Sequence, residues 1–335
     1  MNRVAIIILN WNCADDSIAC AKSILAQTEP SDIIFADNNS SDNSVNKIEY
    51  FINKRNSMYL IKNNKNLGFA GGINSGLRQA LSKKYDYIAL LNPDATADKN
   101  WLKFLVKEMD KHNRCGITTG LMIRSNTGTI DSTGEFYTTW GLPGPRNRDE
   151  SVENAPSKPG EVFGATGGGA IYRAAMFDDI DMFDEDFFMY YEDVDLSFRA
   201  QLAGWKVRFT PKAIAYHKVG ASSKKVPGLA VYNTFKNLPL VFIKNVPGKL
   251  FWYIGLRFFL TYWLIFASAV RHGNGWPAFK GILASIIRNP AAYHKRLSIQ
   301  KNRKVSVNYI RGIIHEGPLP NQTGLLKFRK FFTGK

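Results

Sequence analysis

Cysteine is scarce in this chain of 335 residues, which holds only Cys13, Cys20 and Cys115. An odd number excludes a framework in which every cysteine is paired, and the spacings match no zinc-ligand pattern. We therefore expect a reducing compartment and no disulfides.

A long apolar run near the N-terminus is also lacking. The first run, residues 4–9, is too short for the core of a signal peptide, so we expect no export.

Acidic residues are nearly absent from the last third of the chain. Residues 224–335 hold 19 Lys and Arg but a single acid, Glu316, whereas residues 1–223 hold 25 Lys and Arg against 27 acids. The net charge of +16 thus comes from a basic C-terminal region joined to a near-neutral body. Such asymmetry indicates an anionic partner, either a nucleic acid or a membrane surface. We expect two parts, residues 1–223 and 224–335.

Short apolar runs alternate with helical patterns in the first part. Continuous runs at residues 4–9, 32–36, 58–61 and 87–91 are typical of strands buried on both faces of a parallel sheet. A helix is expected over residues 15–27. The alternation predicts an α/β fold with a doubly wound sheet.

The later part of residues 1–223 is less regular. Residues 125–160 are rich in Gly, Pro, Ser, Thr and Asn, which predicts a long mobile insertion, either a lid over a substrate or a disordered loop. Two separate strands are expected at residues 205–209 and 213–217. The second ends at His217.

Polar residues follow three of the predicted strands. Asn10, Asp37 and Asp94 each stand at or just after a strand end, the place where open α/β sheets bind ligands. An acid there can bond a ribose hydroxyl or hold a divalent cation beside a diphosphate, although Asp37 also fits a turn that caps the next helix. The glycine-rich stretch 66–76 predicts a loop that leads into a helix and that a ligand can approach closely, but it matches neither the Walker pattern nor the dinucleotide fingerprint.

The most unusual stretch is residues 183–199, where carboxylates alternate with aromatic side chains. Val194 and Phe198 begin an apolar stripe that predicts a helix ending near Gly204. Glu192 and Asp193 then lie at the helix start behind aromatic residues, which makes them candidates for proton abstraction or cation binding. The alternative is a set of first-turn acids that only stabilise the helix dipole. We expect that structural role for Asp195.

Five motifs occur in the order found in family 2 glycosyltransferases of the GT-A fold, and the chain is most similar to the bacterial rhamnosyltransferase-like branch. The motifs lie within about residues 3–222: Asn10-Trp11-Asn12, Asp37-Asn38-Asn39-Ser40-Ser41-Asp42, Asn66-Leu67-Gly68-Phe69, Leu91-Asn92-Pro93-Asp94 and Tyr191-Glu192-Asp193-Val194-Asp195-Leu196. The resemblance implies a Rossmann-like GT-A domain with a doubly wound mixed sheet. It also implies a sugar transferase that inverts the anomeric centre.

The resemblance assigns roles to individual residues. Asp193 falls at the general base, with Glu192 beside it. Asp94 and His217 fall at ligands of a divalent cation, Mg²⁺ or Mn²⁺, although Asn92 replaces the first acid of the metal motif. The positions implied in nucleotide-sugar binding are Asn10, Asn12, Asp37, Asn39, Asn66, Gly68, Phe69, Asn74, Asn92, Asp94 and Gly168.

The resemblance also implies substrates. The donor would be a nucleotide-diphosphate sugar, with a rhamnose donor as one candidate. The acceptor would be a polyprenyl-diphosphate-linked glycan of a cell-surface polysaccharide such as O-antigen, capsule or cell wall. The alternative is a polyprenyl-phosphate sugar synthase of the same fold.

The basic region 224–335 is expected to be helical. Residues 250–270 are long and apolar enough to span a bilayer, but Arg257 lies in their first half, where a charge is costly. We favour an interfacial helix or hairpin over a span, with a buried soluble helix as the other alternative. We thus expect membrane association, peripheral or monotopic, at the cytoplasmic face of the inner membrane, supported by basic and aromatic residues 328–332. The aromatic residues of this region lie within apolar runs. Nucleic-acid-binding proteins instead present separated aromatic side chains on which bases stack, which argues against a nucleic-acid partner.

Overall fold

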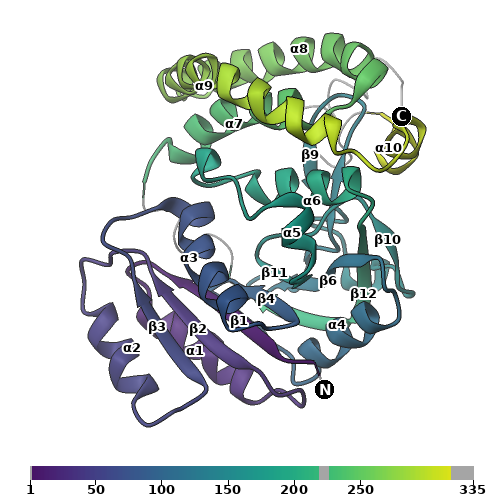
Figure 1. The fold of residues 1–335 in the computed structure, drawn as a ribbon. Helices are drawn as coiled ribbons and strands as arrows, with labels where there is room; N and C mark the ends of the chain where they lie inside the picture. Colours follow the sequence, from purple (N-terminus) through teal and green to yellow (C-terminus); the bar gives the residue numbers. More distant parts are fainter. Residues whose placement is uncertain (1, 219–225, 318–335) are drawn as a thin grey trace.

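The computed structural model describes residues 2–218 and 226–317. Its centre is a mixed sheet with the strand order β10-β12-β6-β11-β4-β1-β2-β3 (Figure 1). The four predicted N-terminal strands are present and parallel: β1 (Val4–Asn10), β2 (Asp32–Asp37), β3 (Met58–Lys62) and β4 (Tyr87–Leu91). The apolar runs of β1, β2 and β4 are buried because helices cover both faces of the sheet, whereas edge strand β3 is only partly buried.

The sheet becomes mixed at β11 (Gly169–Arg173), which runs antiparallel between β4 and β6 (Cys115–Arg124). Strand β12 (Lys206–His217) then pairs in parallel with β6, and short β5 (Ala95–Ala97) pairs with its end. The sequence predicted two strands over this last segment. They form one strand because the chain continues through a register irregularity between Phe209 and Ile214.

The helices divide between the two faces of the sheet. One face packs against α1 (Ala14–Leu25), α2 (Ser44–Ile52) and α4 (Trp101–Asp110) through side chains such as Ile6 and Ile8. The other face packs against α3 (Gly68–Ser82), α5 (Met176–Ile180) and α6 (Glu192–Leu202) through side chains such as Ile7. The α/β architecture with a doubly wound mixed sheet is thus confirmed.

The predicted helix follows the glycine-rich loop, but it begins earlier than expected: α3 starts at Gly68, so the glycines lie in the helix. The glycines allow this helix to lie close to β1. A Cβ atom on Gly72 would stand 2.4 Å from Leu9 Cδ1, and one on Gly76 would stand 2.8 Å from Ile7 Cγ2. Close packing of helix on strand, rather than loop flexibility, explains the glycines here.

Residues 125–160 are also not the mobile insertion that their composition predicted. They form β7 (Ile130–Ser132), β8 (Glu135–Tyr137), β9 (Pro143–Pro145), a short 3₁₀ helix at Val152–Asn154, and β10 (Gly160–Val162). Strand β7 pairs with β6, β8 pairs with β9, and β10 pairs with β12. Ile130 and Tyr137 are buried, so tertiary packing orders a segment whose strands are only three residues long.

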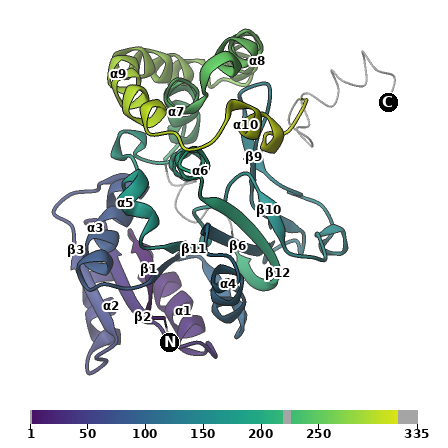
Figure 2. The ribbon, with the colours of Figure 1, turned by 45° about the vertical axis from the view of Figure 1, so that its right-hand side comes forward.

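Four helices follow and form a separate layer on α6: α7 (Leu229–Asn245), α8 (Gly248–Arg271), α9 (Gly275–Lys301) and α10 (Val307–Ile313) (Figure 2). Phe198 and Leu202 on α6 share a hydrophobic core with Phe235, Leu238 and others of the helical layer. The expected helical C-terminal region is therefore present. The basic aromatic residues 328–332 lie outside the described residues.

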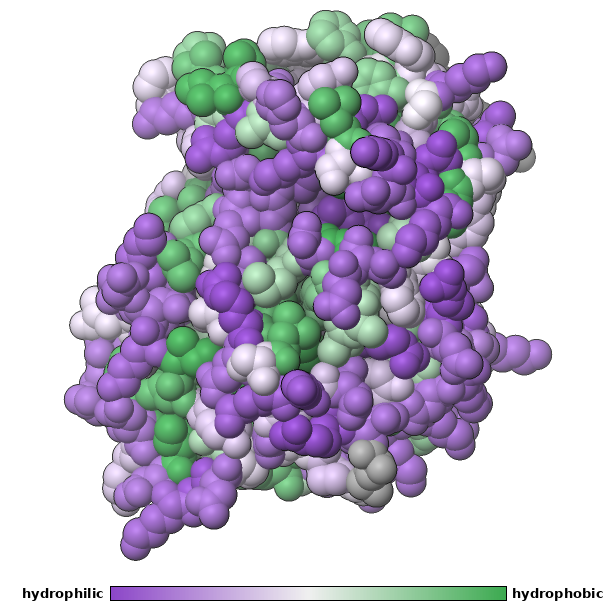
Figure 3. All heavy atoms as spheres, viewed as in Figure 1, coloured by the Kyte–Doolittle hydropathy of each residue, from purple (hydrophilic) through white to green (hydrophobic). Residues whose placement is uncertain are grey.

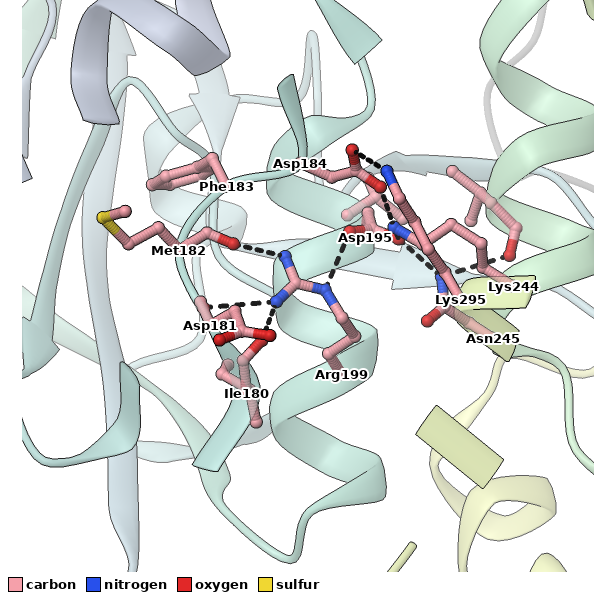
Figure 4. Close-up of polar contacts among 12 residues, drawn as sticks. Ile180, Asp181, Met182, Phe183, Asp184, Asp195, Arg199, Lys244, Asn245 and Lys295 are labelled. Atoms are coloured by element: carbon pink, nitrogen blue, oxygen red, sulfur yellow. Dashed lines mark hydrogen bonds and ion pairs between the residues drawn. The ribbon is translucent and has the colours of Figure 1, made fainter. Parts of the chain in front are cut away.

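A buried ion-pair network joins the helical layer to the sheet domain (Figure 4). Asp195 is fully buried, and its carboxylate accepts from Arg199 Nε at 2.9 Å and from Lys244 Nζ at 2.8 Å. Lys244 also contacts Asp184, which pairs with Lys295 of α9 at 2.6 Å. Asp195 thus serves the packing of α6 against α7, a structural role that differs from the dipole stabilisation expected for it.

Candidate active site

A cavity of about 1090 Å³ opens where β1 and β4 end and where α3 and α6 begin. This is the edge of the sheet at which α/β folds bind ligands. Nine of the residues singled out in the sequence line it together: Asn66, Gly68, Phe69, Asn92, Asp94, Gly168, Glu192, Asp193 and His217. They come from five separate segments of the chain.

Asp193 is partly exposed to this cavity, and two backbone N–H groups hold its carboxylate. Gly167 donates to Oδ2 at 2.9 Å and Val194 donates to Oδ1 at 2.8 Å. Burial raises the pKa of Asp193, while these N–H groups act in the opposite direction because they stabilise the charged form. A carboxylate with a raised pKa whose charged form is stabilised by N–H donors is suited to accept a proton.

Glu192 differs from its neighbour. It is buried, its Oε2 atom has no hydrogen-bond partner, and burial together with the charge of Asp193 raises its pKa well above the ordinary value. Glu135 also lines the cavity, and burial raises its pKa well above the ordinary value too. Burial thus disfavours the charged forms of Glu192 and Glu135 more strongly than that of Asp193, which makes Asp193 the acid best placed to carry a negative charge.

His217 connects two carboxylates at the end of β12. Its Nε2 atom lies 3.1 Å from Asp94 Oδ1, and its Nδ1 atom lies 2.8 Å from Asp131 Oδ2. Burial lowers the pKa of His217, but the hydrogen bonds to Asp131 and Asp94 outweigh it and raise that pKa to about 9.

The pair of Asp94 and His217 fits one side of a cation site. A cation would displace the proton on Nε2, and Asp131 on Nδ1 would fix the resulting tautomer with the Nε2 lone pair toward the metal, as carboxylates behind metal-bound histidines do. Within residues 2–218 and 226–317, no group of three or more His, Cys, Asp or Glu could hold a metal ion. A cation at Asp94 and His217 would therefore take its other ligands from a bound molecule or water.

Five of the sequence-derived positions do not line the cavity. Asp37 is buried behind it and accepts from Asn10 Nδ2 at 2.7 Å and from the N–H of Ser40 at 2.9 Å. Asn12 accepts from the N–H of Ser41 at 2.8 Å, and Asn39 is exposed at a positive φ of 60°.

Asn74 is buried and bonds the backbone N–H and C=O of Phe183. These contacts shape the loops around the cavity. A direct nucleotide-sugar contact by any of the five stays a prediction.

Sequence reasoning missed several residues of the site: Glu135 lines the cavity, whereas Asp131 does not line it but bonds His217. Asp131 and Glu135 lie in the segment expected to be mobile, and each is far along the chain from its partners: Asp131 is 86 residues from His217. Trp11 and Asn38 lie within recognised motifs and line the cavity, whereas their neighbours Asn12 and Asn39 do not. No spacing in the sequence distinguishes these neighbours.

Comparison with known proteins identifies relatives. The family described as glycosyl transferase family 2 matches residues 5–181, which is more than half of the chain. The chain is 23% identical over 217 residues to a poly-beta-1,6-N-acetyl-D-glucosamine synthase of Staphylococcus aureus, covering 64% of this chain and 50% of the synthase. It thus spans about half the length of that relative.

A second relative is the N-acetylglucosaminyl-diphospho-decaprenol L-rhamnosyltransferase of Mycobacterium tuberculosis, 26% identical over 61% of this chain and 71% of that protein. Among solved structures, the mannosyltransferase PcManGT from Pyrobaculum calidifontis in complex with GDP-Man and Mn²⁺ superposes with a TM-score of 0.53. It is 14% identical, and the match covers 99% of this chain and 81% of that one. This likeness concerns the fold. The family match over residues 5–181 and the mixed sheet together lead to one conclusion: the chain belongs to glycosyl transferase family 2 and is a glycosyltransferase with the GT-A fold.

Proposed function

We propose that this glycosyltransferase moves a sugar from a nucleotide-diphosphate donor to a hydroxyl group of a lipid-linked glycan, with inversion at the anomeric carbon. The carboxylate of Asp193, held by the N–H groups of Gly167 and Val194 at the cavity, is the observation that carries the proposal. The acceptor oxygen attacks the anomeric carbon, the bond to the nucleotide diphosphate breaks, and the acceptor proton passes to Asp193. One displacement of this kind requires no carboxylate nucleophile.

Asp193 is the better base of the two adjacent acids. Its backbone hydrogen bonds stabilise the ionised form, whereas Glu192 has no such support on Oε2 and carries a pKa well above the ordinary value. Glu192 would then act as a neutral hydrogen-bonding group that shapes the space beside the acceptor. The role is consistent with its burial under the aromatic residues of the loop before α6.

The donor diphosphate would lie near Asp94 and His217. A divalent cation, Mn²⁺ or Mg²⁺, is supported by the Asp94–His217 pair and by the Mn²⁺ in the complex of PcManGT. When bound, the cation would neutralise the charge that grows on the departing diphosphate. Asp131 would hold the His217 ring with Nε2 toward the site. Asn92, which takes the place of an acid, would contribute an amide close to His217 Nε2, at 3.3 Å.

The acceptor side of the proposal rests on the helical layer. Helix α8 (Gly248–Arg271) is the one helix in the described residues long and apolar enough to cross a membrane. Leu250, Ile254 and Phe258 nevertheless face the interior of the layer, while Trp252 and Leu256 are exposed. A helix with one packed face and one open apolar face is suited to lie at a membrane surface.

Helix α9 adds to the same apolar surface. Trp276, Ile286 and Ile287 are exposed on it, and apolar atoms are visible along the edge of the molecule formed by α8 and α9 (Figure 3). Basic side chains stand among them: Arg257 lies over the Tyr253 ring and Lys280 over the Trp276 ring. We define the exposed apolar side chains of α8 and α9 as the apolar face and propose that it rests on an anionic membrane, on the cytoplasmic side.

A lipid-linked acceptor is held in a membrane, which agrees with the proposal that the apolar face rests there. The rhamnosyltransferase relative is named for an acceptor of that class. Rhamnose remains one candidate sugar, and synthesis of a cell-surface polysaccharide is the corresponding process.

In the experiment that tests the proposal, the purified protein is incubated with radiolabelled dTDP-, UDP- and GDP-sugars and Mn²⁺. The acceptor is either polyprenyl-diphosphate-linked N-acetylglucosamine or polyprenyl phosphate. Transfer to the glycan hydroxyl is the expected result. Transfer to polyprenyl phosphate would make the protein a polyprenyl-phosphate sugar synthase, and transfer to neither acceptor from any donor would refute the proposal.

A further inference from the structure

The segment just before Asp193 has an unusual backbone. Residues 186–191, which we term the acid loop, lead into α6 at Glu192. Phe188, Tyr190 and Tyr191 all have positive φ angles, of 61°, 70° and 69°. Such angles are rare for bulky side chains and persist only where the surroundings impose them.

A tight turn explains part of this geometry. Phe188 has φ 61° and ψ −64°, and the N–H of Met189 donates to the C=O of Phe187 at 2.7 Å, so the chain reverses over three residues. A turn of this type is strained, and the single hydrogen bond within it is not enough to stabilise it. The contacts that hold the acid loop therefore come from other elements.

Helix α3 holds one side of the loop. The N–H of Ala70 donates to the C=O of Phe188 at 3.1 Å. A Cβ atom on Gly68 would stand 2.3 Å from that same carbonyl oxygen, so only glycine allows the approach. The donor side of the cavity thus contacts the acid loop directly.

Helix α7, from the C-terminal layer, holds the other side. Asn237 is fully buried, and its Nδ2 atom lies 3.0, 2.9 and 2.8 Å from the carbonyl oxygens of Phe187, Met189 and Tyr190. An amide has two N–H donors, so one of them is shared between two carbonyls. Lys236, also buried, reaches the carbonyls of Asp186 and Phe187 at 3.1 and 3.0 Å.

These contacts satisfy the backbone of the loop almost completely. Each carbonyl from residue 186 to residue 191 accepts at least one hydrogen bond, and those of Asp186, Met189 and Tyr190 accept from α7 side chains. A buried carbonyl without a donor is costly, so removal of the Asn237 amide would favour another loop conformation. Asp193 follows directly, and a change in the loop would move its carboxylate relative to Gly167.

We propose that Asn237, assisted by Lys236, is a positioning residue for sugar transfer: it fixes the acid loop so that Asp193 meets the acceptor hydroxyl. This inference rests on the proposed function and extends it, because it makes the first helix of the C-terminal layer part of the active-site architecture. Helix α7 then connects the helices that carry the apolar face to the acid loop, which leads into the base.

The chain offers a matched control in Asn233, one turn earlier on α7. Asn233 is 1% exposed, and its Nδ2 atom donates only within the helix, to the C=O of Leu229 at 3.1 Å. The Oδ1 atoms of Asn233 and Asn237 are both buried and have no hydrogen-bond partner among the described residues. Replacement of either residue by Ala removes the same atoms from the same helix, but only Asn237→Ala releases the acid loop.

The experiment compares Asn237→Ala, Asn233→Ala and the wild type by thermal melting, by hydrogen exchange of the acid loop and by transfer kinetics. Both variants should lose thermal stability. Only Asn237→Ala should show faster exchange at residues 187–191 and a kcat lowered about 10- to 100-fold, since displacement of about 1 Å at a reacting group has effects of that size. Its KM for the donor and its affinity for the nucleotide should stay within about twofold of the wild type, because the nucleotide contacts are unchanged.

A second variant covers the case in which Asn237→Ala does not fold. Lys236→Met keeps the length of the side chain, loses the two contacts to Asp186 and Phe187, and should lower kcat in the same direction. Folded variants at Asn237 or Lys236 with the kcat of Asn233→Ala would overturn the positioning role alone. A wild-type protein that transfers no sugar from any donor would overturn the proposed function, and the inference with it.

Discussion

The backbone N–H of Gly167 donates a hydrogen bond of 2.9 Å to Oδ2 of Asp193, which ties the loop before β11 to the first turn of α6. Gly167 has no side chain, and this leaves room for the contact beside the Phe69 ring. A Cβ atom at Gly167 would stand only 3.2 Å from Phe69 Cζ. The bond orients the carboxylate and favours its charged form. The activity and the stability of the protein should thus depend on the contacts that fix this carboxylate, its neighbours and the helical layer.

Asp193→Asn should lower kcat by about 10²- to 10⁴-fold, the range in which general bases contribute, because an amide cannot accept the acceptor proton. Nucleotide affinity should not change, and both can be measured by transfer kinetics and calorimetry. Glu192→Gln should retain more activity than Asp193→Asn, because a neutral carboxyl group resembles an amide. Normal turnover by Asp193→Asn would remove Asp193 from the mechanism.

The rate should depend on pH through the same group. Burial raises the pKa of Asp193 above its ordinary value of 3.8. A base acts only when it is deprotonated, so kcat should fall as pH falls through this raised pKa, and the acid limb should lie above pH 3.8. A profile at saturating donor tests this, with circular dichroism at each pH to confirm folding. An acid limb centred at or below pH 3.8, the ordinary pKa of aspartate, would contradict the inference that burial raises the pKa of Asp193.

The ion-pair network should contribute to folding stability in proportion to its burial. Lys244 and Asp195 are 3% and 0% exposed, so Lys244→Met would weaken the pairing of a buried carboxylate and should cost about 3–5 kcal/mol in urea unfolding. The control is Lys304→Met. Lys304 and its partner Asp179 are 48% and 31% exposed, and loss of such a pair should cost about 0–1 kcal/mol. Equal losses in the two variants would mean that the buried network does not hold the layers together.

The apolar face should determine vesicle binding. Trp252 and Ile287 are 80% and 76% exposed, and Trp252→Ser and Ile287→Ser should each weaken sedimentation with phosphatidylglycerol-containing vesicles by about tenfold or more, since each loses a large apolar contact with lipid. Tyr50→Ser is the control, because Tyr50 is 85% exposed on α2, in the sheet domain. Unchanged binding by both variants would exclude the apolar face as the membrane contact.

Substitutions are preferable here to a truncation at about residue 225. Such a truncation is also predicted to release the protein from membranes, but it would remove α7. That helix packs on α6 and holds the acid loop, so the loss would alter the site as well as the surface.

Much of the fold was predictable because buried parallel strands leave a clear signal. The runs that became β1 to β4 are continuous and apolar, and a polar residue follows each run. The stretch 125–160 gave the opposite impression, since its three-residue strands owe their order to pairing with β6, with β12 and with one another. The glycines of α3 were ambiguous for a similar reason: only the approach of Leu9 and Ile7 shows why they are needed.

The site was predictable where a motif carries it and obscure where distant segments meet. Asp94, Asp193 and His217 line one cavity, as the resemblance implied. The partners that orient them were not apparent, because Asp131 and Asn237 lie in segments without motifs and act through contacts that only the folded chain creates.

The most direct test of the account is a calorimetric titration of the wild-type protein with dTDP, UDP and GDP, each with and without Mn²⁺. The account predicts that one nucleotide binds, that Mn²⁺ strengthens its binding, and that His217→Ala removes the effect of Mn²⁺ while the protein stays folded. No binding of any nucleotide, or binding that neither Mn²⁺ nor His217→Ala alters, would contradict a donor site built on Asp94 and His217.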